Sequence, residues 1–210
     1  MHDHHQTHES PIEIRALIRL GAVALALSGL LFFLYPAARP WHDESTVAGA
    51  VASMSSHAWV AAHVFAMFAL ILMPLGMLAL FGLSAGSRSA RLTLAATVII
   101  WVDAGLALPY YGAEDFALHA IAGQVKLGTP LDLLGLVHSI RFSAVAASTF
   151  TAGLLLLAVG GVLVAYSIWR AAILPRFSGV PLRSRWSSSS HSSTCQHGLG
   201  SRTGRWSRSR

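Results

Sequence analysis

The amino-acid sequence predicts an all-α membrane protein: a membrane-embedded four-helix bundle with short amphipathic helices on its outer side. Hydrophobic residues make up 54% of the 210 residues and charged residues only 11%, whereas soluble domains carry about 25% charged residues. Four apolar runs are long enough to cross a hydrocarbon core of about 30 Å, which takes about 20 helical residues. We expect the spans at about residues 16–35, 58–81, 92–110 and 144–168.

A polar leader, residues 1–14, precedes the first span and contains four histidines, His2, His4, His5 and His8. Histidine-rich tracts can bind transition metals, but a short polar terminus is more often disordered, and we expect disorder here. The leader has no positively charged region ahead of an apolar run and no clearly placed cleavage site, so a removable signal peptide is not expected.

Prolines and single polar residues mark the first three spans. The first is expected to end at Pro36, because proline removes a helical hydrogen bond. The second, AWVAAHVFAMFALILMPLGMLALF, carries His63 and no formal charge, and Pro74 predicts a bend in it. The short turn SAGSRSAR leads into the third span, which contains Asp103 and is expected to end at Pro109.

Residues 111–143 form the longest connection and lead to the fourth span. Two segments of the connection, GAEDFALHAIAG and PLDLLGLVHSIRF, have apolar residues at helical spacing and predict short amphipathic helices that lie at the interface or cap the bundle. The fourth span is rich in small residues, which favour close helix contact in membranes.

The positive charges orient the spans, because loops on the cytoplasmic side carry more lysine and arginine. Six arginines near span ends would share one side: Arg15, Arg19, Arg88, Arg91, Arg170 and Arg176. Arg39, Lys126 and Arg141 would lie on the other side. We therefore expect a multi-pass protein of the cell (plasma) membrane with both termini cytoplasmic and residues 111–143 outside.

The end of the chain, residues 183–210, has a different composition from the spans. It is rich in serine and arginine, has almost no aliphatic residues, and is expected to be disordered. Its arginines account for the whole net charge of +6 and are Arg183, Arg185, Arg202, Arg205, Arg208 and Arg210. They could hold the tail to anionic lipid, but we expect no nucleic-acid partner. The abrupt change after Leu182 suggests a truncated or frame-shifted ending, and the single Cys195 allows no intrachain disulfide.

Three sequence segments, HAWVAAHVFAMFALILMPLGMLALF, LPYYGAEDFALHAIA and SIWRAAILPRFSGVPL, carry a family resemblance. Over about residues 12–182 the chain resembles small uncharacterised bacterial polytopic membrane proteins, in which a short helix follows the third span and an LPR-x-x-GVPL-like turn precedes further spans. The resemblance implies the fold and the membrane location. It brings no assigned activity, and the tail departs from the group where further spans are expected.

The predicted polar site is an intramembrane pair, His63 and Asp103. Counted from the outer ends of the second and third spans, the two residues lie at nearly equal depth on adjacent antiparallel helices. A carboxylate in hydrocarbon needs a partner, and histidine would supply one that titrates near neutral pH. We favour a structural hydrogen bond between the helices. The alternative is a site that handles a proton or a small cation.

A metal or haem site is a second alternative. Nitrogen and oxygen ligands suited to a divalent metal are found at His57, His63, His119, His138, Glu114 and Asp115. Their spacing matches no metal motif, and only His63 lies well inside a span, whereas haem held in a helix bundle needs histidines on facing helices. We therefore predict no cofactor.

The sequence contains no catalytic motif, so we predict no catalytic residue and regard an enzyme as the less favoured class. The sequence therefore predicts a structural or interaction protein of the membrane. Its partners would be the lipid bilayer and either a second copy of the chain or another membrane protein.

Overall fold

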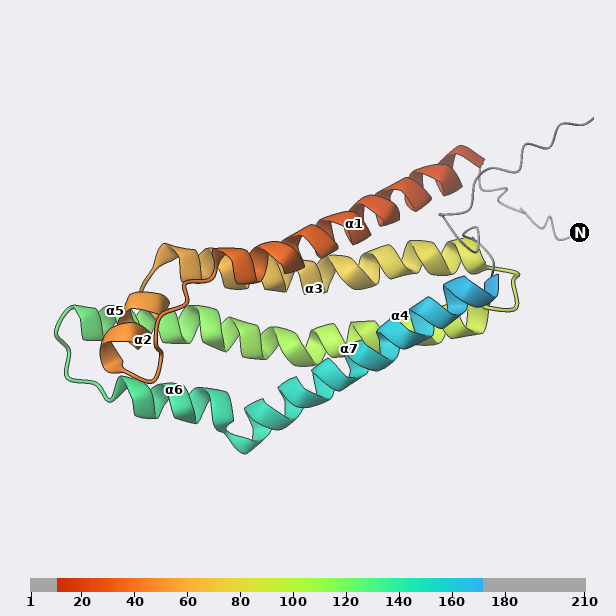
Figure 1. Cartoon of the computed structure of the whole chain (residues 1–210). Coiled ribbons are helices and arrows are strands. Elements are labelled where there is room, and N and C mark those ends of the chain that lie inside the picture. The colour runs from red at the N-terminus through yellow and green to blue at the C-terminus, as the bar shows by residue number, and fades with distance from the viewer. Residues whose placement is uncertain (1–10, 172–210) are drawn as a thin grey trace, which may run out of the picture. The chain divides into compact units, whose positions relative to one another are not determined.

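The structure is a computed structural model and describes residues 11–171. Residues 1–10 and 172–210 lie outside the described residues. They include most of the predicted leader, the whole predicted tail (residues 183–210) and the predicted ending after Leu182. Every element of the described part is helical, which confirms the all-α prediction. The elements are α1 (Pro11–Ala38), α2 (Val47–Met54), α3 (His57–Ser84), α4 (Ala90–Gly112), the π-helix η1 (Ala113–Ala117), α5 (Leu118–Lys126), α6 (Leu133–Phe142) and α7 (Ala144–Ala171) (Figure 1).

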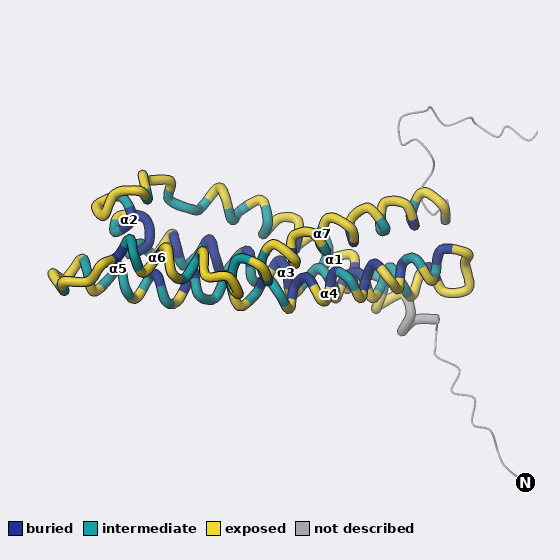
Figure 2. Tube along the Cα trace, turned by 90° about the horizontal axis from the view of Figure 1, so that it is seen from below, coloured by how far each residue is buried: buried dark blue, intermediate teal, exposed yellow. Residues whose placement is uncertain are grey.

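Four helical stretches are long and apolar enough to cross a membrane, by length and composition: Arg15–Ala38, His57–Ser84, Ala90–Lys126 and Ala144–Arg170. They confirm the number of spans that the apolar runs predict. Figure 2 shows exposed positions along the sides of these helices, and large apolar side chains such as Leu20, Phe33 and Val162 are among them. In water such a surface would be costly, so its natural surrounding is lipid.

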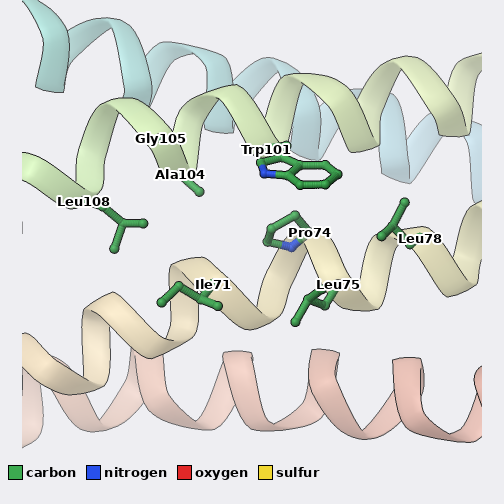
Figure 3. A pocket seen from close by; sticks show the side chains of 8 residues that line it. All are labelled: Ile71, Pro74, Leu75, Leu78, Trp101, Ala104, Gly105 and Leu108. Atoms are coloured by element: carbon green, nitrogen blue, oxygen red, sulfur yellow. The ribbon is translucent and has the colours of Figure 1, made fainter.

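The long helices pack in chain order as a row. α1 packs on α3, α3 packs on α4, and α4 packs on α7, as Figure 1 shows. A tight turn between α3 and α4 makes them antiparallel neighbours, and Gly86 within it has a φ of 78°, a conformation that favours glycine. Between α3 and α4, a groove of about 230 Å³ is lined by apolar side chains such as Ile71 and Trp101 (Figure 3).

Glycines allow α1 and α3 to approach each other closely. A Cβ atom added at Gly21 would overlap the Cβ atom of Ala79, and one added at Gly76 would lie within 2.8 Å of Leu25 Cδ2. Without a strong hydrophobic driving force between helices in lipid, this close backbone contact is a main source of helix association.

Gly21→Ala is therefore expected to push α1 off α3. Overpacking of a tight contact costs about 1–3 kcal/mol, which would lower the midpoint of thermal unfolding of the purified protein in detergent. Gly29→Ala on the same helix is the control, because nothing lies within 4 Å of a Cβ atom there. Equal midpoints for the two variants would contradict the packing described for α1.

Several predicted boundaries are corrected. α1 begins at Pro11 rather than after residue 14, and proline suits the first turn of a helix. The third span does not end at Pro109. Helices α4, η1 and α5 follow one another without a break, and 37 residues from Ala90 to Lys126 are helical. Proline removes only its own N–H donor, and its carbonyl oxygen still accepts the N–H of Ala113.

One end of the bundle carries a helical cap, which we define as α2, η1, α5 and α6. Its small core contains seven buried residues: Ala50, Met54, Trp59, Leu118, Ala122, Leu133 and Val137. The sequence predicted no helix at α2, which begins where the Thr46 hydroxyl accepts the N–H of Gly49 at 3.1 Å. Asp132 caps α6 in the same way by accepting the N–H of Gly135 at 3.0 Å.

Candidate functional site

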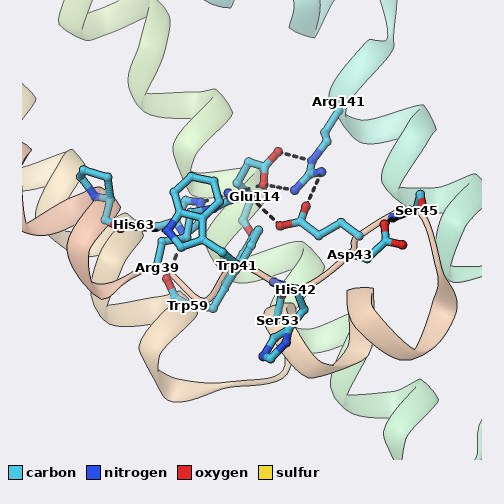
Figure 4. A network of polar contacts seen from close by, with 12 residues as sticks. Arg39, Trp41, His42, Asp43, Ser45, Ser53, Trp59, His63, Glu114 and Arg141 are labelled. Carbon is cyan, nitrogen blue, oxygen red and sulfur yellow. Dashed lines mark hydrogen bonds and ion pairs between the residues drawn. The ribbon is translucent and has the colours of Figure 1, made fainter.

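Two arginines and two glutamates form a connected group between the cap and the bundle (Figure 4). Arg141 on α6 donates to both carboxylate oxygens of Glu114 on η1, and its Nη1 donates to Glu44 Oε2 at 2.8 Å. Glu44 also accepts a bond from Arg39 Nη2 at 2.7 Å. We call Arg39, Glu44, Glu114 and Arg141 the ion network. It ties together the segment after α1, the loop before α2, η1 and α6.

The ion network is largely shielded from solvent and has no formal net charge. The side chains of Glu114 and Arg141 are only 8% and 16% exposed. Burial alone lowers the pKa of Arg141, but the hydrogen bonds and charges of Glu114 and Glu44 outweigh it, so the pKa is raised above its usual value. Arg141 is therefore held as a cation in the ion network, and its two-pronged contact with Glu114 is the strong form of such a pair.

Trp59 lies against this network at the start of α3. The indole Nε1–H donates to the backbone carbonyl of Glu114 at 2.9 Å. The guanidinium carbon of Arg39 lies 4.9 Å from the Trp59 ring centroid and 4.5 Å from that of Trp41, within the range of a cation–π contact. Trp59 is completely buried, so it joins the cap core to the ion network.

The π-helix η1 explains why two consecutive acids, Glu114 and Asp115, are both buried. Its wider turn, in which the N–H of Leu118 bonds to the carbonyl of Ala113, changes the direction of the side chains relative to α4. Glu114 reaches Arg141, whereas both oxygens of Asp115 lack a hydrogen-bond partner among the described residues. Single π turns inside α-helices are frequently found at functional sites.

His63 borders the ion network. Its Nδ1–H donates to the carbonyl oxygen of Trp59 at 2.8 Å, and its Nε2 lies 3.9 Å from Glu114 Oε2. The ring packs 4.4 Å from the Trp59 ring and 5.5 Å from the Tyr35 ring, centroid to centroid. The acid that His63 faces is thus Glu114.

Asp103 does not form the hydrogen-bonded pair with His63 that the sequence predicted. Both of its carboxylate oxygens are buried without a hydrogen-bond partner in the part of the chain that the structure describes. The predicted depth was wrong because it was counted from a third span ending at Pro109. Counted from the turn shared by α3 and α4, His63 lies about 32 Å along α3 and Asp103 only about 20 Å along α4, while Glu114 lies at about 36 Å.

The six residues considered as metal ligands are spread over the cap end. The rings of His57 and His119 lie 6.5 Å apart, and His119 Nδ1–H donates to the carbonyl of Met54 at 2.8 Å. His138 is exposed and packs beside Phe142. Within residues 11–171, no group of three or more His, Cys, Asp or Glu side chains is placed to hold a metal ion. The predicted set is therefore not gathered into one site.

Arg39, Glu44 and Arg141 were not among the predicted site residues, although the sequence contains a signal for the two arginines. Both were assigned to the side of the membrane that is otherwise poor in positive charge. An arginine on the side with few positive charges does not help to orient the protein in the membrane. Such an arginine is therefore a candidate for an internal ion pair.

Comparisons with protein-family models, with curated proteins and with solved structures found no match. The fold and the site by themselves define a class: a membrane-embedded helical protein with an ion network between its bundle and a helical cap.

Proposed function

We propose that this chain is a structural or interaction protein of the cell membrane and that the ion network fastens the helical cap to the bundle. The carrying observation is a chain of contacts from the bundle to the cap. Arg39, directly after α1, bonds to Glu44, and Arg141 on α6 bonds to Glu44 and to Glu114 on η1, which continues α4 without a break. The four charges pair with one another, and the guanidinium groups of Arg39 and Arg141 lie over the Trp59 ring. Such an arrangement is suited to holding elements in place. The cap then presents a fixed surface at one face of the membrane.

The proposed partners are the bilayer, along the exposed apolar sides of the spans, and a membrane protein or a second copy of the chain at the cap. Exposed apolar residues of the cap, Phe116, Leu127 and Phe142, support an interaction role, with exposed fractions of 63%, 81% and 64%. Large exposed apolar side chains gathered in this way are typical of a surface that contacts protein or lipid. The haem or metal alternative has less support, because the six candidate ligands are not gathered into one site within residues 11–171.

The proposed orientation places both termini in the cytoplasm and the cap outside, supported by the distribution of arginine. In a Cys195→Ser background, single cysteines at Ser45 and Gln124 are expected to react with an impermeant maleimide in intact cells. A cysteine at Ser87, in the α3–α4 turn, is expected to react only after the cells are opened. Labelling of the Ser87 position alone in intact cells would reverse the orientation and contradict the proposal.

A further inference from the structure

Asp103 is an acid in the apolar middle of the bundle. It is 0% exposed, and both of its carboxylate oxygens lack a hydrogen-bond partner among the described residues. No other aspartate or glutamate occurs in α4, which carries Asp103, or in α3 and α7, the two long helices that pack on α4. It lies about 20 Å from the start of α4, well inside a hydrocarbon core of about 30 Å.

The carboxyl group of Asp103 faces α7. A Cβ atom added at Gly153 of α7 would lie 3.3 Å from Asp103 Oδ1 and 3.4 Å from the Asp103 carbonyl oxygen. The glycine thus leaves just enough room for the carboxyl group against the α7 backbone. This position separates Asp103 from the ion network, which is about 16 Å further along the same helix.

Within residues 11–171, Asp103 has no positively charged partner. The arginines of α4 and α7, Arg91 and Arg170, lie at the far ends of those helices, and Arg91 is about 18 Å away along α4. The titratable groups toward the cap include His63 on α3, Tyr110 and Tyr111 on α4, and Glu114 and Asp115 on η1. The cations Arg39 and Arg141 at that end bond to Glu44 and Glu114 of the ion network. None of these groups is a cation that pairs with Asp103 in the structure.

We propose that Asp103 is a proton-binding site in the membrane: it is held as the neutral carboxylic acid and exchanges its proton with water. A lone carboxylate at the centre of a span is costly, whereas the neutral acid needs no counter-ion. A metal cation would require several oxygen ligands, but a proton requires only the one carboxyl group. In the exchange, the O–H bond of the acid breaks and a water molecule takes the proton, which leaves the carboxylate. The site goes beyond the structural role proposed above and does not depend on it.

Infrared difference spectroscopy of the full-length protein in liposomes at neutral pH tests the proposal. The unmodified protein minus Asp103→Asn should show one carbonyl band of a protonated carboxylic acid, and the band should shift when H₂O is replaced by D₂O. The other carboxyl groups are common to both proteins and cancel. Absence of the band would show that Asp103 is ionised, and a band that does not shift would show that its proton does not exchange. Either result overturns the proposal.

Two glycine variants locate the band without removing the acid. Gly153→Ala should shift the frequency of the acid carbonyl, because the new methyl group contacts Oδ1. Gly161→Ala on the same helix should leave the band unchanged, because nothing lies within 4 Å of a Cβ atom there. If Asp103→Asn fails to fold, the two glycine variants still test the proposal. An acid carbonyl band at the same frequency in Gly153→Ala and Gly161→Ala would exclude Asp103 as the source of the band.

Discussion

Replacing Arg141 by methionine is expected to lower the free energy of unfolding by about 3 kcal/mol. Removal of one partner from a buried ion pair costs about 3–5 kcal/mol, because the other charge stays buried without compensation. Here Glu114 would lose both bonds from the guanidinium group, and Glu44 would keep only Arg39. The expected loss lies at the low end of this range because the side chains of the ion network are not fully shielded from solvent. Denaturant unfolding of the purified protein in detergent, followed by circular dichroism, measures the change.

Two companion variants make the Arg141 result specific. Arg170→Met, at the exposed end of α7, should change stability by less than about 0.5 kcal/mol. The double variant Arg141→Met with Glu114→Gln should recover part of the lost free energy of unfolding. The glutamine amide is neutral, so no unpaired charge is left buried at position 114. If Arg141→Met were no more harmful than Arg170→Met, the ion network would not hold the cap, and the proposed structural role would lose its support.

The spans could be predicted from the sequence because lipid imposes a simple requirement. A helix must present about 20 apolar residues to cross the membrane, and the runs around Leu25, Leu70, Ile100 and Leu157 meet that requirement without reference to one another. The short α3–α4 turn could also be predicted, since the polar segment between these two apolar runs is too short to form another element.

The short helices α5 and α6 of the cap were also predicted from helical spacing. The way the cap is held depends on contacts between distant parts of the chain, so these contacts could not be predicted in the same way. Arg141 and Glu44 are separated by 97 residues, and no local spacing links them. The prediction places the end of the third span at Pro109, so it does not include the helical continuation to Lys126. That error also shifted the depth assigned to Asp103 by about 12 Å relative to His63, about two helical turns, and produced a pair that the structure does not contain.

The second large effect is expected at Trp59, where the cap core and the ion network meet. Trp59→Ala should lower the free energy of unfolding by about 3–5 kcal/mol, the cost of truncating a large buried aromatic side chain. The substitution removes the ring that packs against His63 and Arg39 and the donor to the Glu114 carbonyl. Denaturant unfolding in detergent gives the value.

Trp59→Phe separates the two contributions of that side chain. The phenyl ring keeps most of the apolar contact but has no N–H group, so the Glu114 carbonyl loses a hydrogen bond worth about 1 kcal/mol. Trp101→Ala on α4 is the matched control, because 57% of that side chain is exposed and it faces the apolar groove of Figure 3. We expect the order of loss to be Trp59→Ala, then Trp59→Phe, then Trp101→Ala. A loss at Trp101 equal to that of Trp59→Ala would mean that general loss of tryptophan surface, rather than the junction of cap and bundle, determines stability.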